Sequence, residues 1–372
     1  MKIVVNAFSA KIGGGKTYLH NLLQNLPQED LQVYIFGYDD LESLQAENVR
    51  RVRTRFPVYN PLLRLLWEYF ILPRWLSKLD ADILFCPGGL VNTKAPKNCR
   101  VVTMFRNMLP FDDQALAIAT SPWLRLKNYL LKKRMLSSMA SADLVIFISE
   151  YARCVIEKKI KVKNAVTIAH GIGDPFFVAD KFLARPPLPF EQKYILYVSR
   201  FEFYKRHLEL VQAYARLSQD LRDEYKLLMV GGGDGLVAKK VDDFIVDNKL
   251  SRDVYVLGEY KYSELPALYK NASLFTFVSA CENCPNILLE AMGAGLPIIS
   301  SSYDPMPEFG GDAVMYASPE DPDQLALSIA SALSDPQMLA THSDKVAIRA
   351  KSFKWSKTAE LTWASLFKVG RP

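Results

Sequence analysis

The chain has 372 residues, 49% of them hydrophobic and 23% charged, with a formal net charge of +6. That length exceeds what one ordinary hydrophobic core fills, so it predicts two domains, and the composition excludes a disordered chain. No apolar run reaches the ~20 residues that a membrane-spanning helix needs. The five cysteines are an odd number without an export signal before them, which predicts reduced thiols in a cytoplasmic protein.

The chain begins with the pattern of a doubly wound α/β unit. Lys2 to Phe8 predicts a buried strand, a glycine cluster follows, and a helix is expected from Lys16 to Leu26. Because glycine lets the backbone approach a phosphate or sugar closely, Gly14 and Gly15 are candidate binding residues. The segment GGGKT also resembles the end of a P-loop, although Ala10 stands where that motif needs glycine. A P-loop ATPase therefore remains an alternative.

Strands and helices alternate up to residue 172, and two of the helices leave alternatives open. The aromatic-rich segment Pro61 to Leu79 predicts a helix that either packs in the core or contacts a membrane. Ser121 to Met135 predicts a basic amphipathic helix, which either rests on an anionic membrane surface or presents an ordinary solvated face. Residues 1–175 carry 24 Lys and Arg against 15 Asp and Glu, a net charge of +9, whereas the remainder carries 22 against 25, a net charge of −3. The first half is thus the part expected to meet an anionic partner.

A proline-rich segment, residues 173–192, is predicted to link the first domain to a second one. Strands and helices alternate again from Tyr194 onward, which implies a second parallel sheet with ligands at the C-terminal strand ends. We expect an N-terminal domain over residues 1–172 and a C-terminal domain over residues 193–352. The tail from Asp335 to Lys368 is predicted to be helical.

The stretch from Cys281 to Pro297 is the strongest candidate for a functional site. A helix is predicted to begin near Pro285, since proline is favoured at the first helical position. The backbone N–H groups of Asn286, Ile287 and Leu288 would then be free to bind phosphates, with Glu290 about one turn further in. This arrangement fits a phosphorylated ligand with a diol. The alternative is an amphipathic helix packed on a sheet, with the carboxylate merely exposed.

The run ENCPNILLEAMGAGLPII resembles the E-x7-E segment of the GT4 family of retaining glycosyltransferases. The resemblance implies the α/β fold called GT-B, two Rossmann-like doubly wound domains facing across a cleft, with a C-terminal helix (about 353–372) completing the first. It further implies that Glu290 holds the nucleotide ribose, that Glu282 lies by the transferred sugar, and that the backbone of Asn286, Ile287 and Leu288 faces the diphosphate.

A second segment, VSRFEFYKRH, resembles the family motif G-R-x-x-x-x-K-G. Ser199 and Arg206 replace its two glycines, and the resemblance implies that Arg200 and Lys205 contact the donor phosphates. The sequence departs from the family after the strand that ends at Phe105, where a histidine is expected beside the sugar. Either Arg106 or Asn107 contacts the sugar instead, or the acceptor is held differently.

The resemblance implies a retaining transfer of a hexose from a nucleoside diphosphate sugar to a hydroxyl group, with no metal or other cofactor and no nucleic acid partner. The basic first half favours a lipid-linked saccharide of bacterial surface polysaccharide assembly as acceptor, and a cytoplasmic enzyme located peripherally on the inner face of the membrane. A nucleotide-sugar epimerase or hydrolase of the same fold is the alternative within the family.

Overall fold

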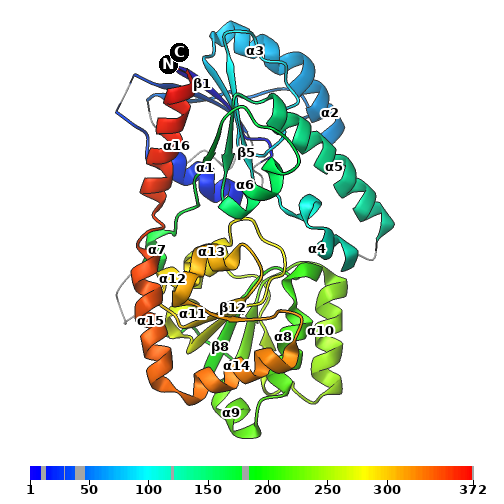
Figure 1. The fold of residues 1–372 in the computed structure, drawn as a ribbon, viewed down its shortest axis with the longest axis vertical. Coiled ribbons are helices and arrows are strands. Elements are labelled where there is room, and N and C mark those ends of the chain that lie inside the picture. Colours follow the sequence, from blue (N-terminus) through cyan, green and yellow to red (C-terminus); the bar gives the residue numbers. More distant parts are fainter. Residues whose placement is uncertain (10–13, 29, 38–46, 119–120, 178–183, 371–372) are drawn as a thin grey trace. The chain divides into compact units, whose positions relative to one another are not determined.

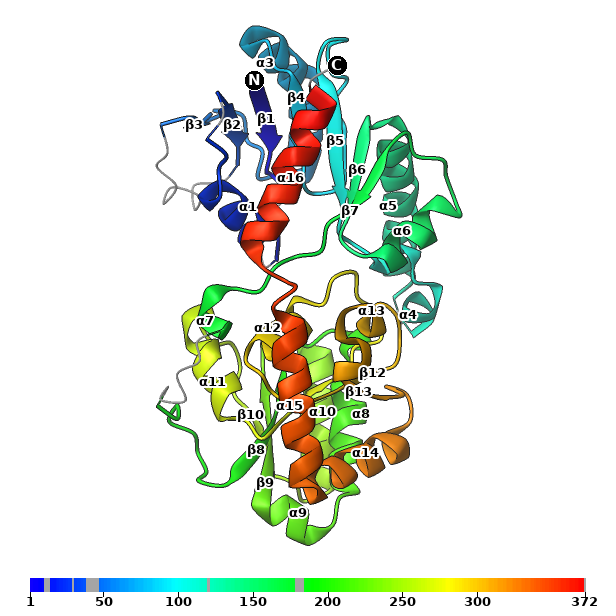
Figure 2. The same ribbon diagram turned by 60° about the vertical axis from the view of Figure 1, so that its left-hand side comes forward.

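The computed structural model describes residues 1–9, 14–28, 30–37, 47–118, 121–177 and 184–370. They form two compact units, each built on one parallel sheet (Figures 1 and 2). The first unit runs from Met1 to Phe111 and from Ser121 to Gly171, and helix α16 (Trp355–Gly370) completes it. The second unit runs from Ile172 to Lys354 and includes α4 (Asp113–Ile118).

The sheet of the first unit has seven parallel strands in the order β3-β2-β1-β4-β5-β6-β7. Strands β2 and β3 follow on one side of β1, and strands β4 to β7 follow on its other side. The strand order therefore reverses between β1 and β4. Ligands bind at such a reversal in open α/β sheets, outside the C-terminal strand ends. The strands are β1 (Lys2–Asn6), β2 (Gln32–Phe36), β3 (Val49–Arg51), β4 (Ile83–Cys86), β5 (Arg100–Phe105), β6 (Leu144–Phe147) and β7 (Ala165–Thr167).

Helices cover both faces of this sheet. On one face, Trp67, Leu72 and Leu76 pack on the strands with Val4 and Leu84. On the other face lie α1 and α16, which contact each other. The helices are α1 (Gly14–Gln24), α2 (Pro61–Leu66), the π-helical turn η2 (Trp67–Ile71), α3 (Leu72–Leu79), the 3₁₀ turn η3 (Leu109–Phe111), α5 (Pro122–Ser141) and α6 (Glu150–Glu157).

Polar contacts fix α16 to the first unit although it comes last in the sequence. The Trp363 indole N–H donates to the Leu22 carbonyl at 3.1 Å, and the hydroxyl groups of Tyr18 and Thr362 lie 3.0 Å apart. These side chains are buried, so each polar group has the partner that burial requires. Figure 2 shows α16 lying across the strands of this unit.

The sheet of the second unit has six parallel strands in the order β10-β9-β8-β11-β12-β13, with the reversal between β8 and β11. They are β8 (Lys193–Val198), β9 (Tyr225–Val230), β10 (Val254–Val256), β11 (Leu274–Phe277), β12 (Ile298–Ser301) and β13 (Met315–Ala317). The helices are α7 (Asp174–Phe177), α8 (His207–Ala215), α9 (Gln219–Glu224), α10 (Gly235–Asp247), α11 (Leu265–Asn271), α12 (Asn286–Gly293), α13 (Met306–Gly310), α14 (Pro322–Ser334) and α15 (Pro336–Ala350), with 3₁₀ turns η4 (Phe203–Lys205), η5 (Tyr262–Glu264) and η6 (Gly311–Ala313).

The two doubly wound parallel sheets confirm the predicted fold class, whereas some helix boundaries differ from the prediction. The segment predicted as one helix from Pro61 to Leu79 contains the π-helical turn η2. The predicted helical tail is two helices, because α15 ends at Ala350 and α16 begins at Trp355. The helix α4 groups with the second unit, although the sequence placed it within the first domain.

Candidate functional site

The candidate residues of the second unit follow β8 and β11, the two strands that flank the reversal of strand order. Arg200 and Lys205 follow the end of β8 at Val198, and Glu282 lies in the loop between β11 and α12. In a parallel sheet this edge is where ligands bind. The fold therefore brings both charged segments that the sequence singled out to one place.

A glycine-rich turn after β9 holds the loop that carries Arg200. The Phe201 N–H donates to the Gly232 carbonyl at 2.8 Å, and a Cβ atom on Gly231 would lie 1.9 Å from the Ser199 carbonyl oxygen. Since Gly231 also has a φ of +150°, only glycine fits there without displacing the backbone. These glycines are thus required by the approach of two backbones, and they fix the position of the exposed Arg200.

Lys205 and Glu282 form an ion pair between the two loops. Their side chains are only 10% and 14% exposed, and the Lys205 ammonium lies 5.5 Å from the ring centres of both Tyr204 and Phe277. The Ala280 N–H also donates to the Tyr204 carbonyl at 2.8 Å, which ties the loops together through the backbone. A cation held this way is already oriented and partly desolvated before any ligand arrives.

Helix α12 begins at Asn286, directly after Pro285. The Leu289 N–H donates to the Pro285 carbonyl at 3.0 Å as the first helical hydrogen bond. The Asn286 N–H donates to the Cys284 carbonyl at 3.0 Å, so the prediction of a free N–H at this residue was wrong. The amides of Ile287 and Leu288 lie in the first turn, where no preceding helical carbonyl reaches them. They remain the candidate donors to an anion at this helix end.

Glu290 is partly buried, rather than exposed as in the amphipathic-helix alternative. The Tyr269 hydroxyl donates to its Oε2 at 3.5 Å, and Tyr262 is a second hydroxyl donor. Burial raises the pKa of Glu290 from 4.5 to about 8, and the two tyrosine hydrogen bonds oppose this shift only in part. Neither tyrosine was predicted as a partner of Glu290, because both precede it by more than twenty residues and belong to a different connection between strands.

The contacts of Arg206, at the last position of the motif, and of His207, which follows it, were not predicted. Arg206 adopts the left-handed conformation at φ 54°, and its guanidinium pairs with Glu209 at 2.7 Å and with Glu320. His207 is buried and stacks on Phe201 with ring centres 4.1 Å apart. Burial lowers the pKa of His207 to about 3, so this imidazole is neutral at physiological pH and serves packing.

In the first unit, Arg106 and Asn107 follow the end of β5. The Arg106 guanidinium lies 5.9 Å from the ring centre of Tyr18, and the exposed Asn107 accepts a hydrogen bond from the Leu109 N–H at 3.3 Å. Both therefore lie at the ligand-binding edge of this sheet. Gly14 is the first residue of α1 and Gly15 is buried in it, whereas the rest of the predicted glycine cluster, Gly13, lies outside the described residues.

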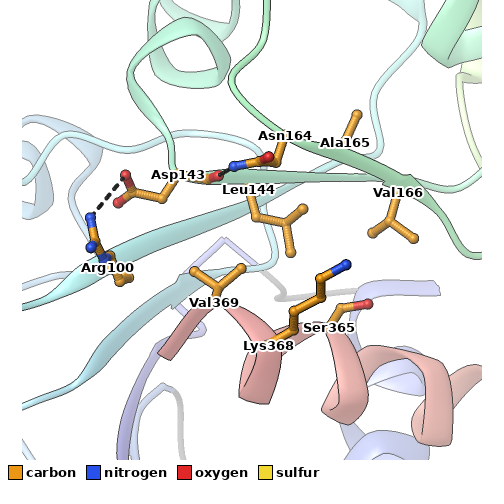
Figure 3. Close-up of a pocket in the computed structure, with 9 residues that line it drawn as sticks. All are labelled: Arg100, Asp143, Leu144, Asn164, Ala165, Val166, Ser365, Lys368 and Val369. Carbon is orange, nitrogen blue, oxygen red and sulfur yellow. Dashed lines mark hydrogen bonds and ion pairs between the residues drawn. The ribbon is translucent and has the colours of Figure 1, made fainter. Parts of the chain in front are cut away.

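A pocket of about 550 Å³ opens at the opposite edge of the first sheet (Figure 3). Its lining includes Arg100, Leu144 and Ala165, the first residues of β5, β6 and β7. Arg100 and Asp143 are 3.9 Å apart there, and Lys368 reaches in from α16. Because ligands of parallel sheets bind at the C-terminal strand ends, this pocket is not a candidate for the main site.

The pair Cys281-x-x-Cys284 lies in the loop that carries Glu282. Both thiols are buried, and burial together with the nearby carboxylates of Asp112 and Glu282 raises the pKa of Cys281. Among the described residues, no three His, Cys, Asp or Glu side chains gather closely enough to hold a metal ion.

Two family models match this chain. The model described as Glycosyltransferase Family 4 matches residues 12–174, and the model described as Glycosyl transferases group 1 matches residues 179–351. The first match contains the GGGKT segment, so the P-loop alternative is set aside.

Known proteins similar to this chain are glycosyltransferases. The O-antigen chain mannosyltransferase B of Escherichia coli is 26% identical over 280 residues, covering 71% of this chain and 69% of that protein. Sucrose-phosphate synthase from Thermosynechococcus elongatus superposes with a TM-score of 0.79 at 18% identity, covering 99% of this chain and 98% of the other. The Anabaena protein HepE, solved in complex with UDP, gives a TM-score of 0.73 at 16% identity over 99% of this chain and all of the other. This chain is a glycosyltransferase with the GT-B fold and belongs to the group 1, family 4 glycosyltransferases.

Proposed function

We propose that this protein is a retaining hexosyltransferase that uses a nucleoside diphosphate sugar as donor. The observation that carries the proposal is the convergence of Arg200, the Lys205–Glu282 ion pair and Glu290 at the reversal point of the second sheet. The two cations suit the phosphates of a ligand, and the carboxyl with its two hydroxyl donors suits a diol. Together they fit a ligand that combines phosphates, a sugar and a diol. The UDP complex of HepE supports a nucleotide at this type of fold.

Each residue has a distinct role in this proposal. Arg200 and Lys205 bind the donor phosphates, together with the amides of Ile287 and Leu288 at the N-terminus of α12. Glu290 binds the ribose hydroxyl groups. Glu282 lies beside the transferred hexose and keeps the Lys205 ammonium in place. When the bond between the anomeric carbon and the diphosphate breaks, its electron pair moves to the diphosphate, and the two cations and the helix end stabilise that charge.

Retention of configuration requires the acceptor oxygen to attack the face from which the diphosphate leaves. We propose that the departing phosphate takes the proton of the acceptor hydroxyl while the new bond to the anomeric carbon forms. The catalytic groups are then cations and amides, and we propose that neither a metal ion nor another cofactor takes part. No side chain is assigned as general base.

The proposed acceptor is a hydroxyl of a lipid-linked saccharide in bacterial surface polysaccharide synthesis. Similarity to an O-antigen mannosyltransferase and the +9 charge of residues 1–175 favour an anionic carrier of this kind. In the first unit, Arg106 and Asn107 are proposed to contact this acceptor, and Gly14 and Gly15 allow close backbone approach. The enzyme would act in the cytoplasm, at the inner face of the membrane.

Calorimetric titration of the purified protein with UDP, GDP, dTDP and ADP, without added metal, tests the donor site. One nucleoside diphosphate should bind, Glu290→Ala should abolish that binding, and Lys16→Ala, which alters the first turn of α1 in the first unit, should leave it intact. Incubation with the matching sugar nucleotides and a lipid-linked acceptor, followed by NMR of the product, should show the anomeric configuration of the donor. Consumption of donor without transfer would favour the epimerase or hydrolase alternative, and inversion would refute the proposed mechanism.

A further inference from the structure

Helix α5 presents apolar side chains to solvent rather than to the core. Trp123, Leu126, Tyr129 and Leu130 are between 49% and 72% exposed. The helix buries its opposite side instead, where the buried residues are Asn128, Met135, Ser138 and Met139. Ordinary surface helices have the reverse pattern, with charged residues outward and apolar residues inward. The outward apolar side of α5 is therefore largely left uncovered by the part of the chain that the structure describes.

Basic side chains flank this outward side, and α5 has no acidic residue. Arg125, Lys127, Lys132, Lys133 and Arg134 give the helix five positive charges within 20 residues. At 100° per residue, Leu126, Leu130 and Lys133 lie along one row and Trp123, Lys127 and Arg134 along the next. The outward side of α5 therefore carries exposed apolar and aromatic side chains interleaved with cations, and both kinds of side chain favour contact with an anionic membrane interface.

A second exposed apolar patch lies on α2 and η2. Leu62, Leu66, Tyr69 and Phe70 are between 47% and 72% exposed and follow helical spacing. The rings of Tyr69 and Phe70 are in edge-to-face contact with centres 4.8 Å apart. The same segment buries Trp67 and Glu68 on its other side. The patch is thus the outer side of a segment whose inner side is already packed.

Asn92 and a shared pocket place α5 next to η2. Asn92 connects them: its amide N–H donates to Glu68 of η2 at 2.6 Å, and its carbonyl oxygen accepts from the Arg134 guanidinium of α5 at 2.8 Å. Between the two elements lies a pocket of about 420 Å³ lined by Tyr69, Asn92, Lys94 and Arg134, among others. Figure 1 shows α2 and α5 as neighbours within the first unit. We call the exposed side chains of α2, η2 and α5 together the α2/α5 surface.

We propose that the α2/α5 surface binds the face of an anionic lipid bilayer. Apolar and aromatic side chains on both elements supply area for the interfacial region, and the cations of α5 complement anionic head groups. A second copy of this chain suits the surface less well, because a symmetric contact would bring ten positive charges of two α5 helices together. Among the described residues, no helix is long and apolar enough to cross a membrane, so the proposal concerns attachment to its surface.

The proposal goes beyond glycosyl transfer and is tested without donor or acceptor, so its failure would leave the donor site untouched. The full chain is centrifuged with vesicles of phosphatidylcholine alone or with added phosphatidylglycerol. We expect binding to the anionic vesicles at low salt and a clear loss at high salt, because exposed charges are screened. Emission from Trp123 should shift to shorter wavelength on binding, and the shift should disappear in Trp123→Phe. Equal binding to neutral vesicles, or no binding, would overturn the proposal.

Paired variants separate this surface from the general charge of the protein. Lys127→Gln/Lys133→Gln and Leu126→Ser/Leu130→Ser should each weaken binding about tenfold or more, because the first removes two cations and the second two leucines that would enter the membrane interface. The matched controls lie in the second unit: Lys240→Gln/Lys345→Gln and Leu236→Ser/Leu327→Ser make the same changes at other exposed side chains. Controls that weaken binding as much as the test variants would refute the assignment. All eight side chains are exposed, and thermal unfolding checks that each variant is folded. Sedimentation of the protein as a dimer in the absence of lipid would instead assign the surface to self-association and overturn the proposal.

Discussion

Replacement of Glu290 by glutamine should make the second unit more stable, and increasingly so as pH rises from 5 to 8. Burial raises the pKa of this carboxyl from 4.5 to about 8 in the folded protein. The unfolded chain therefore releases the proton at lower pH than the folded chain does. Above pH 4.5 ionisation favours the unfolded state, so stability falls as pH rises until the folded carboxyl also ionises near pH 8. Glutamine has the shape of the neutral carboxyl and never ionises.

The size of the effect follows from the two pKa values. A shift from 4.5 to about 8 is 3.5 units, and each unit corresponds to about 1.4 kcal/mol, so the full difference is about 5 kcal/mol above pH 8. By proton linkage, the ionisation of Glu290 lowers the free energy of unfolding by roughly 1 kcal/mol at pH 5 and by about 3 kcal/mol at pH 7. Between pH 5 and pH 7 the advantage of Glu290→Gln in free energy of unfolding should thus grow by about 2 kcal/mol. The Tyr262 and Tyr269 hydroxyl groups can still donate to the amide oxygen.

Urea unfolding followed by circular dichroism at pH 5, 6, 7 and 8 measures this difference. All five tryptophans belong to the first unit, so tryptophan fluorescence reports that unit and should respond little to the substitution. Glu191→Gln, which alters an exposed carboxyl of the second unit, is the control and should change stability by less than about 0.5 kcal/mol at each pH. A difference that stays constant from pH 5 to pH 8, or a Glu290→Gln protein less stable at pH 7, would show that the carboxyl is not held in a desolvating environment.

Two further substitutions test how the loops of the site are held. Gly231→Ala should destabilise the second unit by about 3 kcal/mol, because its Cβ would lie 1.9 Å from the Ser199 carbonyl oxygen. The control Gly235→Ala, with no atom within 4 Å of its Cβ, should be neutral or slightly stabilising. Equal unfolding midpoints of the two variants in urea would contradict this prediction. Lys205→Met should lower the free energy of unfolding by about 2–3 kcal/mol, because it leaves Glu282 without its partner. The double variant Lys205→Met/Glu282→Gln should lose less stability than the sum of the two single variants. Additive losses in the same urea assay would mean that the pair is not coupled.

Much of this architecture is predictable because it depends on local pattern. Buried strands alternating with amphipathic helices define parallel sheets, and the glycines after β9 mark a turn at the ligand-binding edge. The charged residues of the site were found through their spacing within two short segments, 198–207 and 281–297. Both segments happen to follow strands that are neighbours only in the folded sheet. Sequence spacing located each segment, and topology placed them together.

Contacts between distant segments could not be predicted in the same way. Tyr262 and Tyr269 reach Glu290 from a different β–α connection, and no property of the intervening residues marks them as its partners. Likewise, the basic and apolar composition of α5 was visible, but the side on which it packs was not. In the folded protein, α5 buries the polar Asn128 and Ser138 on its inner side, so its apolar side faces outward. A pattern of apolar residues alone predicts the opposite orientation.

The departures from the family motif at Ser199 and Arg206 are accommodated in different ways. Arg206 has φ 54°, a left-handed conformation that costs a non-glycine residue about 1 kcal/mol, and its guanidinium pairs with Glu209 and Glu320. In this chain the position has a left-handed backbone angle and also room for a long side chain. Ser199 is different: it keeps a negative φ, and the close approach at its carbonyl is accommodated by Gly231 on the neighbouring strand end. Neither replacement therefore forces the loop that carries Arg200 and Lys205 out of a regular connection between β8 and α8.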